Sequence, residues 1–245
     1  IGQSAFSGCS NLKSITIPSN VLTIGKSAFS HCINLGTILI RAPITTIPHS
    51  AFHFCSNLES IIFPSTITSI GESAFSHCFK LSSINIPPSV ISIGDMTFSH
   101  CSRLESIILP SSLITIGNSA FSHCSNLKSI ITPDAVAYIG KKAFYHCINL
   151  KTIELTSNLQ TIGESAFTYC SSVTSITIPI GLASMRRCLF SYCTKLTSIS
   201  IPHHVKVIEK YAFFYCSNLK SISIPSTVTL IRSYAFANCY NIQML

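Results

Sequence analysis

Phenylalanine recurs at a strict interval of 23 residues along this chain of 245 residues. The positions are Phe6, Phe29, Phe52, Phe75, Phe98, Phe121, Phe144, Phe167, Phe190, Phe213 and Phe236. Cysteine keeps the same interval from Cys9 to Cys239, and only Cys188 stands outside this column. An unbroken period of this length is typical of a solenoid, in which each repeat packs only against its neighbours. We therefore expect one continuous solenoid over residues 1–245, with ten full repeats and a partial eleventh.

Each repeat contains a strand, a turn and a compact return segment. In residues 12–18, Ile15 and Ile17 alternate with polar residues as a half-buried strand requires, and a proline without a backbone donor follows them. Gly25 is expected to allow a sharp bend. The spacing of Ala28, Phe29 and Cys32 predicts a short helical or 3₁₀ turn. With strands about 4.8 Å apart, ten coils would form a rod roughly 50 Å long.

The expected fold is therefore a right-handed superhelix of the β/α type. A parallel sheet would form its concave face, and short helical or 3₁₀ turns would form its convex face. Apolar residues are 47% of the chain and charged residues only 10%, which excludes a disordered polyelectrolyte. No window approaches 18 consecutive apolar residues, so we expect no membrane-spanning segment.

Neither a signal peptide nor a polar capping repeat is visible in the sequence. The first residues lack a basic start and a cleavage site. The last residues, Ile242, Gln243, Met244 and Leu245, are mostly apolar, whereas a terminal coil needs a polar cap. We expect a fragment of a longer array whose uncapped repeats could associate end to end.

The pattern Leu-x-x-Ile-x-Ile-Pro-x-x-Val-x-x-Ile-Gly-x-x-Ala-Phe-x-x-Cys, read over residues 12–32, resembles the treponemal-type leucine-rich repeats of BspA-like surface proteins. The resemblance covers the whole chain. It implies a secreted or cell-surface module that adheres to host matrix proteins, other cells or glycans. It transfers no site residues, because the shared motif consists of core positions. The pattern is broken at residues 41–43, at Thr132 and most heavily at residues 185–189, where we expect a distorted coil.

The first candidate site is a row of aliphatic residues between the two inward isoleucines of the strands. Leu39, Ile62, Ile108 and Ile131 belong to this outward column, and Glu59 and Glu105 in a neighbouring column could form its rim. A stacked aliphatic row on the concave sheet predicts a protein-binding surface. The alternative is that β-branched residues simply suit strands, and residue identity does not separate these interpretations.

The second candidate site is a basic cluster in the C-terminal part of the chain. The net charge is +8, and only +2 of it comes from residues 1–184. Arg186, Arg187, Lys210 and Arg232 occupy two repeat positions on successive coils and should lie together. Such a cluster could bind sulfated glycans, sialylated surfaces or nucleic acid, or it could be a solvated edge. No aromatic residues interleave with it, so we expect no specific nucleic-acid binding.

Two further columns have structural and chemical interpretations. The histidine column could share a metal ion or cover the back of the core, and we expect no metal because no acidic ligand recurs beside it; its members are His31, His77, His100, His123 and His146. The cysteine column could form disulfides or pack as free thiols, and the parallel side-chain directions favour free thiols. Cys188 is then the candidate reactive thiol.

No catalytic constellation or cofactor motif is present in the sequence, which favours a non-enzymatic protein without a cofactor. Two functions remain open. The first is adhesion to a host matrix protein, cell-surface protein or glycan. The second is a structural spacer within a larger surface protein, favoured by the regular column Ser14, Ser60, Ser83, Ser106 and Ser129.

Overall fold

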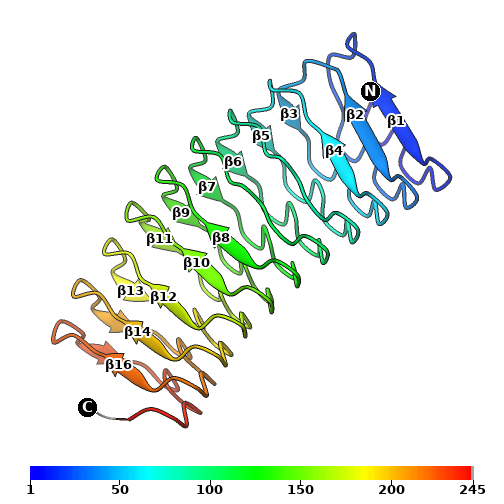
Figure 1. Ribbon diagram of the computed structural model, residues 1–245. Helices are drawn as coiled ribbons and strands as arrows, with labels where there is room; N and C mark the ends of the chain where they lie inside the picture. The colour runs from blue at the N-terminus through cyan, green and yellow to red at the C-terminus, as the bar shows by residue number, and fades with distance from the viewer. Residues whose placement is uncertain (244–245) are drawn as a thin grey trace.

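The computed structural model describes residues 1–243 as an elongated stack of similar coils, one for each repeat (Figure 1). Each coil contributes to three long faces. The first face carries β1 (Ser14–Ile17), β2 (Thr37–Ile40), β4 (Ser60–Ile62), β8 (Ser129–Ile131), β10 (Thr152–Glu154), β12 (Ser175–Thr177), β14 (Ser198–Ser200) and β16 (Ser221–Ser223).

The second face carries a row of even shorter strands. They are β3 (Thr46–Ile47), β5 (Ser69–Ile70), β6 (Ser92–Ile93), β7 (Thr115–Ile116), β9 (Tyr138–Ile139), β11 (Thr161–Ile162), β13 (Ser184–Met185), β15 (Val207–Ile208) and β17 (Leu230–Ile231). The third face, which we call the turn face, is formed by residues 28–35 and their counterparts in the other coils.

All strand pairs are parallel, and every residue pairs with its counterpart 23 positions later. In β1 and β2, for example, Ile15 pairs with Ile38 and Thr16 pairs with Leu39. Identical repeat positions therefore stack into rows, some inside the rod and some on its surface. The phenylalanine row fills the interior, with neighbouring ring centroids 5.1 to 5.7 Å apart.

The helical or 3₁₀ turns expected on the convex face are absent from residues 1–243, so that part of the predicted fold is wrong. Ser27 and His31 adopt left-handed backbone conformations, with φ of 53° and 59°, which interrupt a helix. The amide of Phe29 bonds to the carbonyl oxygen of Ala51 in the next coil at 2.8 Å. The turn face is thus a ladder between coils, and the described structure is a parallel β-solenoid.

The glycine that precedes most of the turn segments lies in close contact with the neighbouring coil. Gly25, which was expected to allow a sharp bend, does not have a left-handed backbone conformation. A Cβ atom added at Gly117 would lie 2.6 Å from the backbone nitrogen of Asp95, and one added at Gly163 would lie 2.3 Å from that of Lys141. A side chain at Gly117 or Gly163 would therefore require the local backbone to shift, whereas the coils at Glu209 and Arg232 already accommodate one.

Both sheets are interrupted at the coil where the sequence pattern is most broken. On the first face β10 does not pair with β12, and on the second face β11 does not pair with β13. The turn face remains joined there, because the amide of Phe167 bonds to the carbonyl oxygen of Leu189 at 3.1 Å. The expected distortion is therefore present as a seam, which we define as the junction between the coils of β10–β11 and β12–β13.

The described part of the chain has no helix that is long and apolar enough to cross a membrane. Two of the four terminal residues that suggested an uncapped end, Met244 and Leu245, lie outside the described residues.

Candidate functional site

The first face exposes most of the aliphatic row predicted from the sequence. The side chains of Ile108, Ile62 and Ile131 are 80%, 63% and 58% exposed, whereas Leu39 is half-buried. Ile108 and Ile131 lie on adjacent coils. Asn85 separates Ile108 from Ile62, and it forms an isolated parallel bridge to Ile108. The row is thus a two-isoleucine patch with a third isoleucine beyond a polar gap.

Glu59 and Glu105 are both exposed on the same face. The ammonium of Lys128 donates a hydrogen bond to the Glu105 carboxylate at 2.6 Å. This hydrogen bond, together with the charge of Lys128, holds the pKa of Glu105 below its usual range. The rim of the patch therefore consists of the Glu105–Lys128 ion pair and the carboxylate of Glu59.

A small cavity of about 250 Å³ lies beside Ile62. Its lining is Ile61, Ile62, Phe63, Ser65, Asn85, Pro87 and Pro88. The ladder is weak here, since the first face of the described chain carries no strand between residues 63 and 128, and β5, β6 and β7 all belong to the second face. This combination gives the aliphatic patch a shallow apolar depression at one end.

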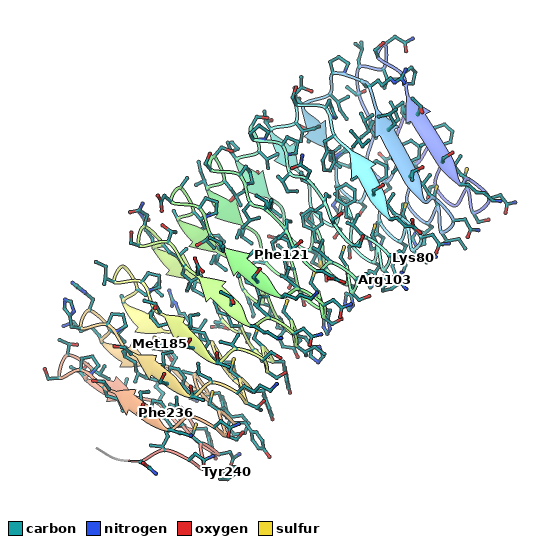
Figure 2. All side chains as sticks on the ribbon, in the orientation of Figure 1. Lys80, Arg103, Phe121, Met185, Phe236 and Tyr240 are labelled. Carbon is teal, nitrogen blue, oxygen red and sulfur yellow. The ribbon has the colours of Figure 1, made fainter. Side chains whose placement is uncertain are left out.

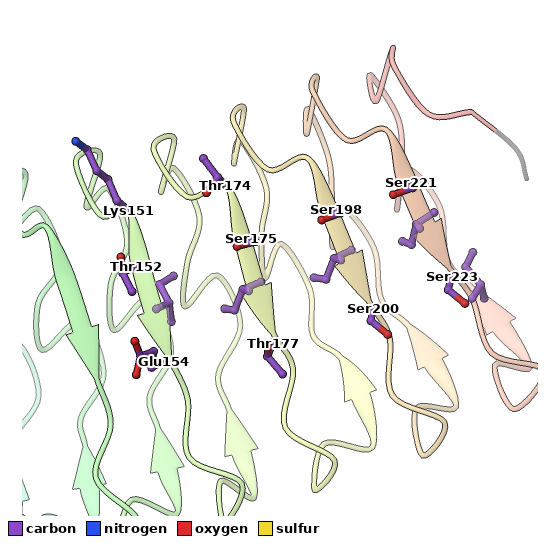
Figure 3. A pocket seen from close by; sticks show the side chains of 15 residues that line it. Lys151, Thr152, Glu154, Thr174, Ser175, Thr177, Ser198, Ser200, Ser221 and Ser223 are labelled. Atoms are coloured by element: carbon purple, nitrogen blue, oxygen red, sulfur yellow. The ribbon is translucent and has the colours of Figure 1, made fainter.

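The C-terminal half of the first face carries a larger concavity that the sequence analysis did not identify. A groove of about 910 Å³ runs across β10, β12, β14 and β16. Figure 3 shows serine and threonine side chains along it, with Lys151 and Glu154 at one end. The hydroxyl-bearing residues are Thr152, Thr174, Ser175, Thr177, Ser198, Ser200, Ser221 and Ser223.

The change in character along the first face could have been found in the sequence. The outward column is aliphatic at Ile108 and Ile131, becomes acidic at Glu154, and is hydroxylic from Thr177 onward. The depth of the groove was not accessible in the same way, because it depends on how four coils are placed relative to one another.

The basic cluster comes together as predicted, but two carboxylates share it. A cavity of about 240 Å³ is lined by Glu164, Arg186, Arg187, Glu209, Lys210 and Arg232. Arg232 Nε lies 3.0 Å from the Glu209 carboxylate. Four cations and two anions leave a local charge of only +2. The repeat columns contained this signal, since Glu209 shares the column of Arg186, and Glu164 shares that of Arg187.

The cysteine column consists of free thiols that bond to the neighbouring coil. All twelve cysteines are free, and nine of them are buried. The thiol of Cys101 donates to the carbonyl oxygen of Phe75 at 3.2 Å, and the thiol of Cys124 donates to that of Phe98 at 3.1 Å. Burial raises the pKa of the Cys55 thiol to about 12. Such thiols are poor nucleophiles at neutral pH.

The histidine column lies on the turn face, where its rings stack on one another. The ring centroids of His77 and His100 are 4.4 Å apart, and those of His100 and His123 are 4.3 Å apart. Burial, and then the charge of neighbouring imidazoles, lowers the pKa of His77 to about 4. Residues 1–243 contain no group of three or more His, Cys, Asp or Glu side chains placed to hold a metal ion.

The comparisons with known proteins agree with this geometry. A model of the BspA-type leucine-rich repeat region matches residues 1–105, 91–193 and 183–245. The structure is similar to a leucine-rich repeat protein from Bacteroides ovatus, with 29% identity, a TM-score of 0.74, and coverage of 98% of this chain and 80% of the other.

Two further solved structures are similar. A leucine-rich cell-surface protein from Faecalibacterium prausnitzii is 28% identical, with a TM-score of 0.59 and coverage of 99% of this chain and 81% of the other. The pneumococcal vaccine antigen PcpA is 22% identical, with a TM-score of 0.62 and coverage of 92% and 64%, and this likeness concerns the fold alone. No curated protein sequence matches. With its repeat pattern matched from end to end, the chain belongs to the BspA-type leucine-rich repeat family.

Proposed function

We propose that this chain is a non-enzymatic recognition module at a cell surface, and that it binds a host matrix or cell-surface protein through the first face. The single observation that carries the proposal is the pair Ile108 and Ile131, two large aliphatic side chains exposed on adjacent coils. Such a pair, rimmed by the Glu105–Lys128 ion pair, resembles the apolar centre and polar rim of protein interfaces.

A surface location is supported by the relative from Faecalibacterium prausnitzii, which is described as a cell-surface protein. Solenoids of this kind offer long continuous surfaces because each coil adds one more row to the same face. We also propose that the repeats act as one continuous unit, with the hydroxyl groove extending the contact beyond the aliphatic patch. A glycan could occupy that groove in place of a protein segment.

The test is a binding titration of the chain against fibronectin and fibrinogen, with a double variant Ile108→Ser and Ile131→Ser. Serine occurs in the same column at Ser200 and Ser223, so the fold should tolerate it. Because burying an isoleucine contributes about 1.5 to 3 kcal/mol, the variant should bind at least about tenfold more weakly.

The matched control is the double variant Ile91→Ser and Ile114→Ser on the second face, where the side chains are 50% and 46% exposed. Equal weakening by both double variants would contradict a first-face site. The absence of saturable binding to any host protein would favour the structural spacer, for which the regular serine column on the same face is the supporting observation.

A further inference from the structure

The turn face has a charge composition unlike the rest of the molecule. Residues 28–35 and their counterparts in the other coils contain none of the eight acidic residues of the chain. They contain six of the nine histidines, which are His31, His53, His77, His100, His123 and His146. They also contain Lys80, Arg103 and Lys195, so this face carries +3 with neutral histidines and +9 with charged ones.

Five of the six histidine rings, all except His53, belong to one continuous stack along the rod. From Phe54 through His77, His100 and His123 to His146, successive ring centroids are 4.2 to 4.8 Å apart and the rings are stacked. The faces of these rings are therefore covered by neighbouring rings, and only their edges are available to a ligand.

The edges carry ring nitrogens that reach solvent. The rings of His77, His100 and His123 are half-buried and make no side-chain hydrogen bond within residues 1–243. In that same part of the chain, His53 Nδ1 is the one buried side-chain nitrogen or oxygen without a hydrogen-bond partner. The nitrogens of the three rings are thus accessible and available as hydrogen-bond donors.

Two permanent cations lie next to the middle of this stack. Lys80 follows His77 by three residues, Arg103 follows His100 by three residues, and the two cations occupy the same repeat position on adjacent coils. Figure 2 shows Lys80 and Arg103 side by side along one edge of the rod. The other titratable groups that face the stack are His31, His53, Tyr145 and Tyr169.

We propose that the centre of the turn face, comprising Lys80, Arg103, His77, His100 and His123, is a binding site for a linear anionic polysaccharide. Its sulfate or carboxylate groups would accept hydrogen bonds from the row of imidazole N–H groups and pair with the two cations. A nucleic acid fits less well, because base stacking needs free aromatic faces and here the faces are covered.

Binding of an anion at this site is coupled to protonation of its histidines. Burial and mutual repulsion lower the pKa of His77, His100 and His123 in the free protein. A bound anion favours the charged imidazole and raises these pKa values, so binding takes up protons. The affinity for a polyanion therefore increases as the pH falls.

The probe is heparin, titrated by calorimetry at about pH 5.5 and about pH 7.5, in two buffers that differ in ionisation enthalpy. We expect affinity at least about tenfold higher at the lower pH, with proton uptake on binding. The triple variant His77→Phe, His100→Phe, His123→Phe should abolish this pH dependence. Phenylalanine already stands in the stack at Phe54, so the variant should fold.

A second variant, Lys80→Asn with Arg103→Asn, tests the cations, and asparagine is native in that column at Asn57 and Asn126. It should weaken heparin binding at both pH values. The matched control is Arg187→Asn with Lys210→Asn in the basic cluster, where Asn118 is the native precedent. Retained binding in the control supports the turn-face site.

Three results would overturn the proposal. The first is heparin binding that the control loses and the histidine variant keeps, which would place the site at the basic cluster. The second is single-stranded RNA binding with equal affinity and equal sensitivity to the histidine variant, which would make nucleic acid the occupant. The third is no heparin binding at either pH. The isoleucine variants of the first face do not enter this test, so its outcome is independent of the proposed protein-binding function.

Discussion

The buried cysteines pack in the core, and their thiols also donate hydrogen bonds to backbone carbonyl oxygens of the neighbouring coil. The carbonyl oxygen of Phe75 accepts the amide of Cys78 at 3.2 Å within its own coil, and it also accepts the thiol of Cys101 at 3.2 Å from the next coil. A cysteine is small enough for this buried position and still carries a weak donor. The column is therefore explained by contact between coils, without any redox chemistry.

Thiol reactivity should divide the cysteines by their environment. Burial raises the pKa of eight of the nine buried thiols, and a hydrogen bond with Cys239, followed by burial, raises that of Cys216. These nine thiols should therefore react with a thiol reagent only when the protein opens. Cys9 is exposed and should react first, while Cys188 and Cys239, which are half-buried, should react more slowly. Mass spectrometry after timed labelling measures this order. Labelling of the buried cysteines at the rate of Cys9 would contradict the described packing.

The stacked imidazoles should make the protein sensitive to acid. The pKa of His77 is lowered to about 4, whereas its unfolded value is 6.5, so below pH 6.5 the unfolded chain binds the proton preferentially. Stability should therefore fall from pH 6.5 to about pH 4 and be unaffected above that window. The variant His77→Phe has no imidazole at this position, so it should not lose this stability at low pH. Because His77 is half-exposed and screened by solvent, we expect a gain of about 1 kcal/mol, or about 2 to 4 °C in Tm, at about pH 5.

The measurement is thermal unfolding of His77→Phe at about pH 5 and about pH 8, with the exposed His204→Ser as control. The variant should differ from the native protein at the lower pH alone, and the control should differ at neither. A stabilisation of equal size at both pH values would show a packing effect in place of proton linkage.

The strands of the first face could be predicted from the sequence, and the turn segments could not. Alternation at Ile15 and Ile17 is a local signal that a strand alone explains. Spacing of Ala28, Phe29 and Cys32 fits a helical turn equally well, and the deciding contact is the bond from Phe29 to Ala51, 22 residues away. The same limit applies to the sites, since the columns identified which side chains are outward but not where coils form a groove.

The glycine column gives a test of the close approach between coils. Gly117→Ala places a Cβ atom 2.6 Å from backbone atoms of Asp95 and Gly94, so the local backbone must shift. We expect a loss of about 2 kcal/mol, seen as a drop of about 4 to 8 °C in Tm. Gly36→Ala is the matched control, because its nearest contact would be 3.7 Å. A control that loses as much stability as Gly117→Ala would show that backbone freedom, and not contact, decides the effect.

Charged residues and strand pairing between coils are both distributed unevenly over the rod. Its acidic residues all lie away from the turn face, while its aliphatic and hydroxyl surfaces divide the first face between the two halves of the chain. The seam lies near the border between these halves, at the junction where β10 and β12 are unpaired. The coils there are held by the turn face, so the seam should be the place where the rod opens most readily.

The seam coincides with Arg186, which stands in a column that glycine occupies in most other coils. The counterpart amides of Gly140 and Gly163 bond to the preceding coil at 2.8 Å, and the described structure contains no such bond from Arg186 to Ile162. Arg186→Gly should allow this bond to form. One hydrogen bond contributes about 1 kcal/mol, so amide exchange at the seam should slow about fivefold. The Tm should change little, because the greater flexibility of glycine in the unfolded chain offsets most of this stabilisation.

Hydrogen exchange of peptides covering residues 182–190 measures this effect. Glu209→Gly is the control, because the Glu209 amide already bonds to Met185 at 2.8 Å and the substitution also removes the ion pair with Arg232. We expect slower exchange at the seam in Arg186→Gly, no slowing in Glu209→Gly, and a lower Tm in Glu209→Gly alone. If Arg186→Gly leaves exchange at the seam unchanged, contact at this column does not hold the coils apart, and the cause lies in the sequence of β12 and its flanking residues.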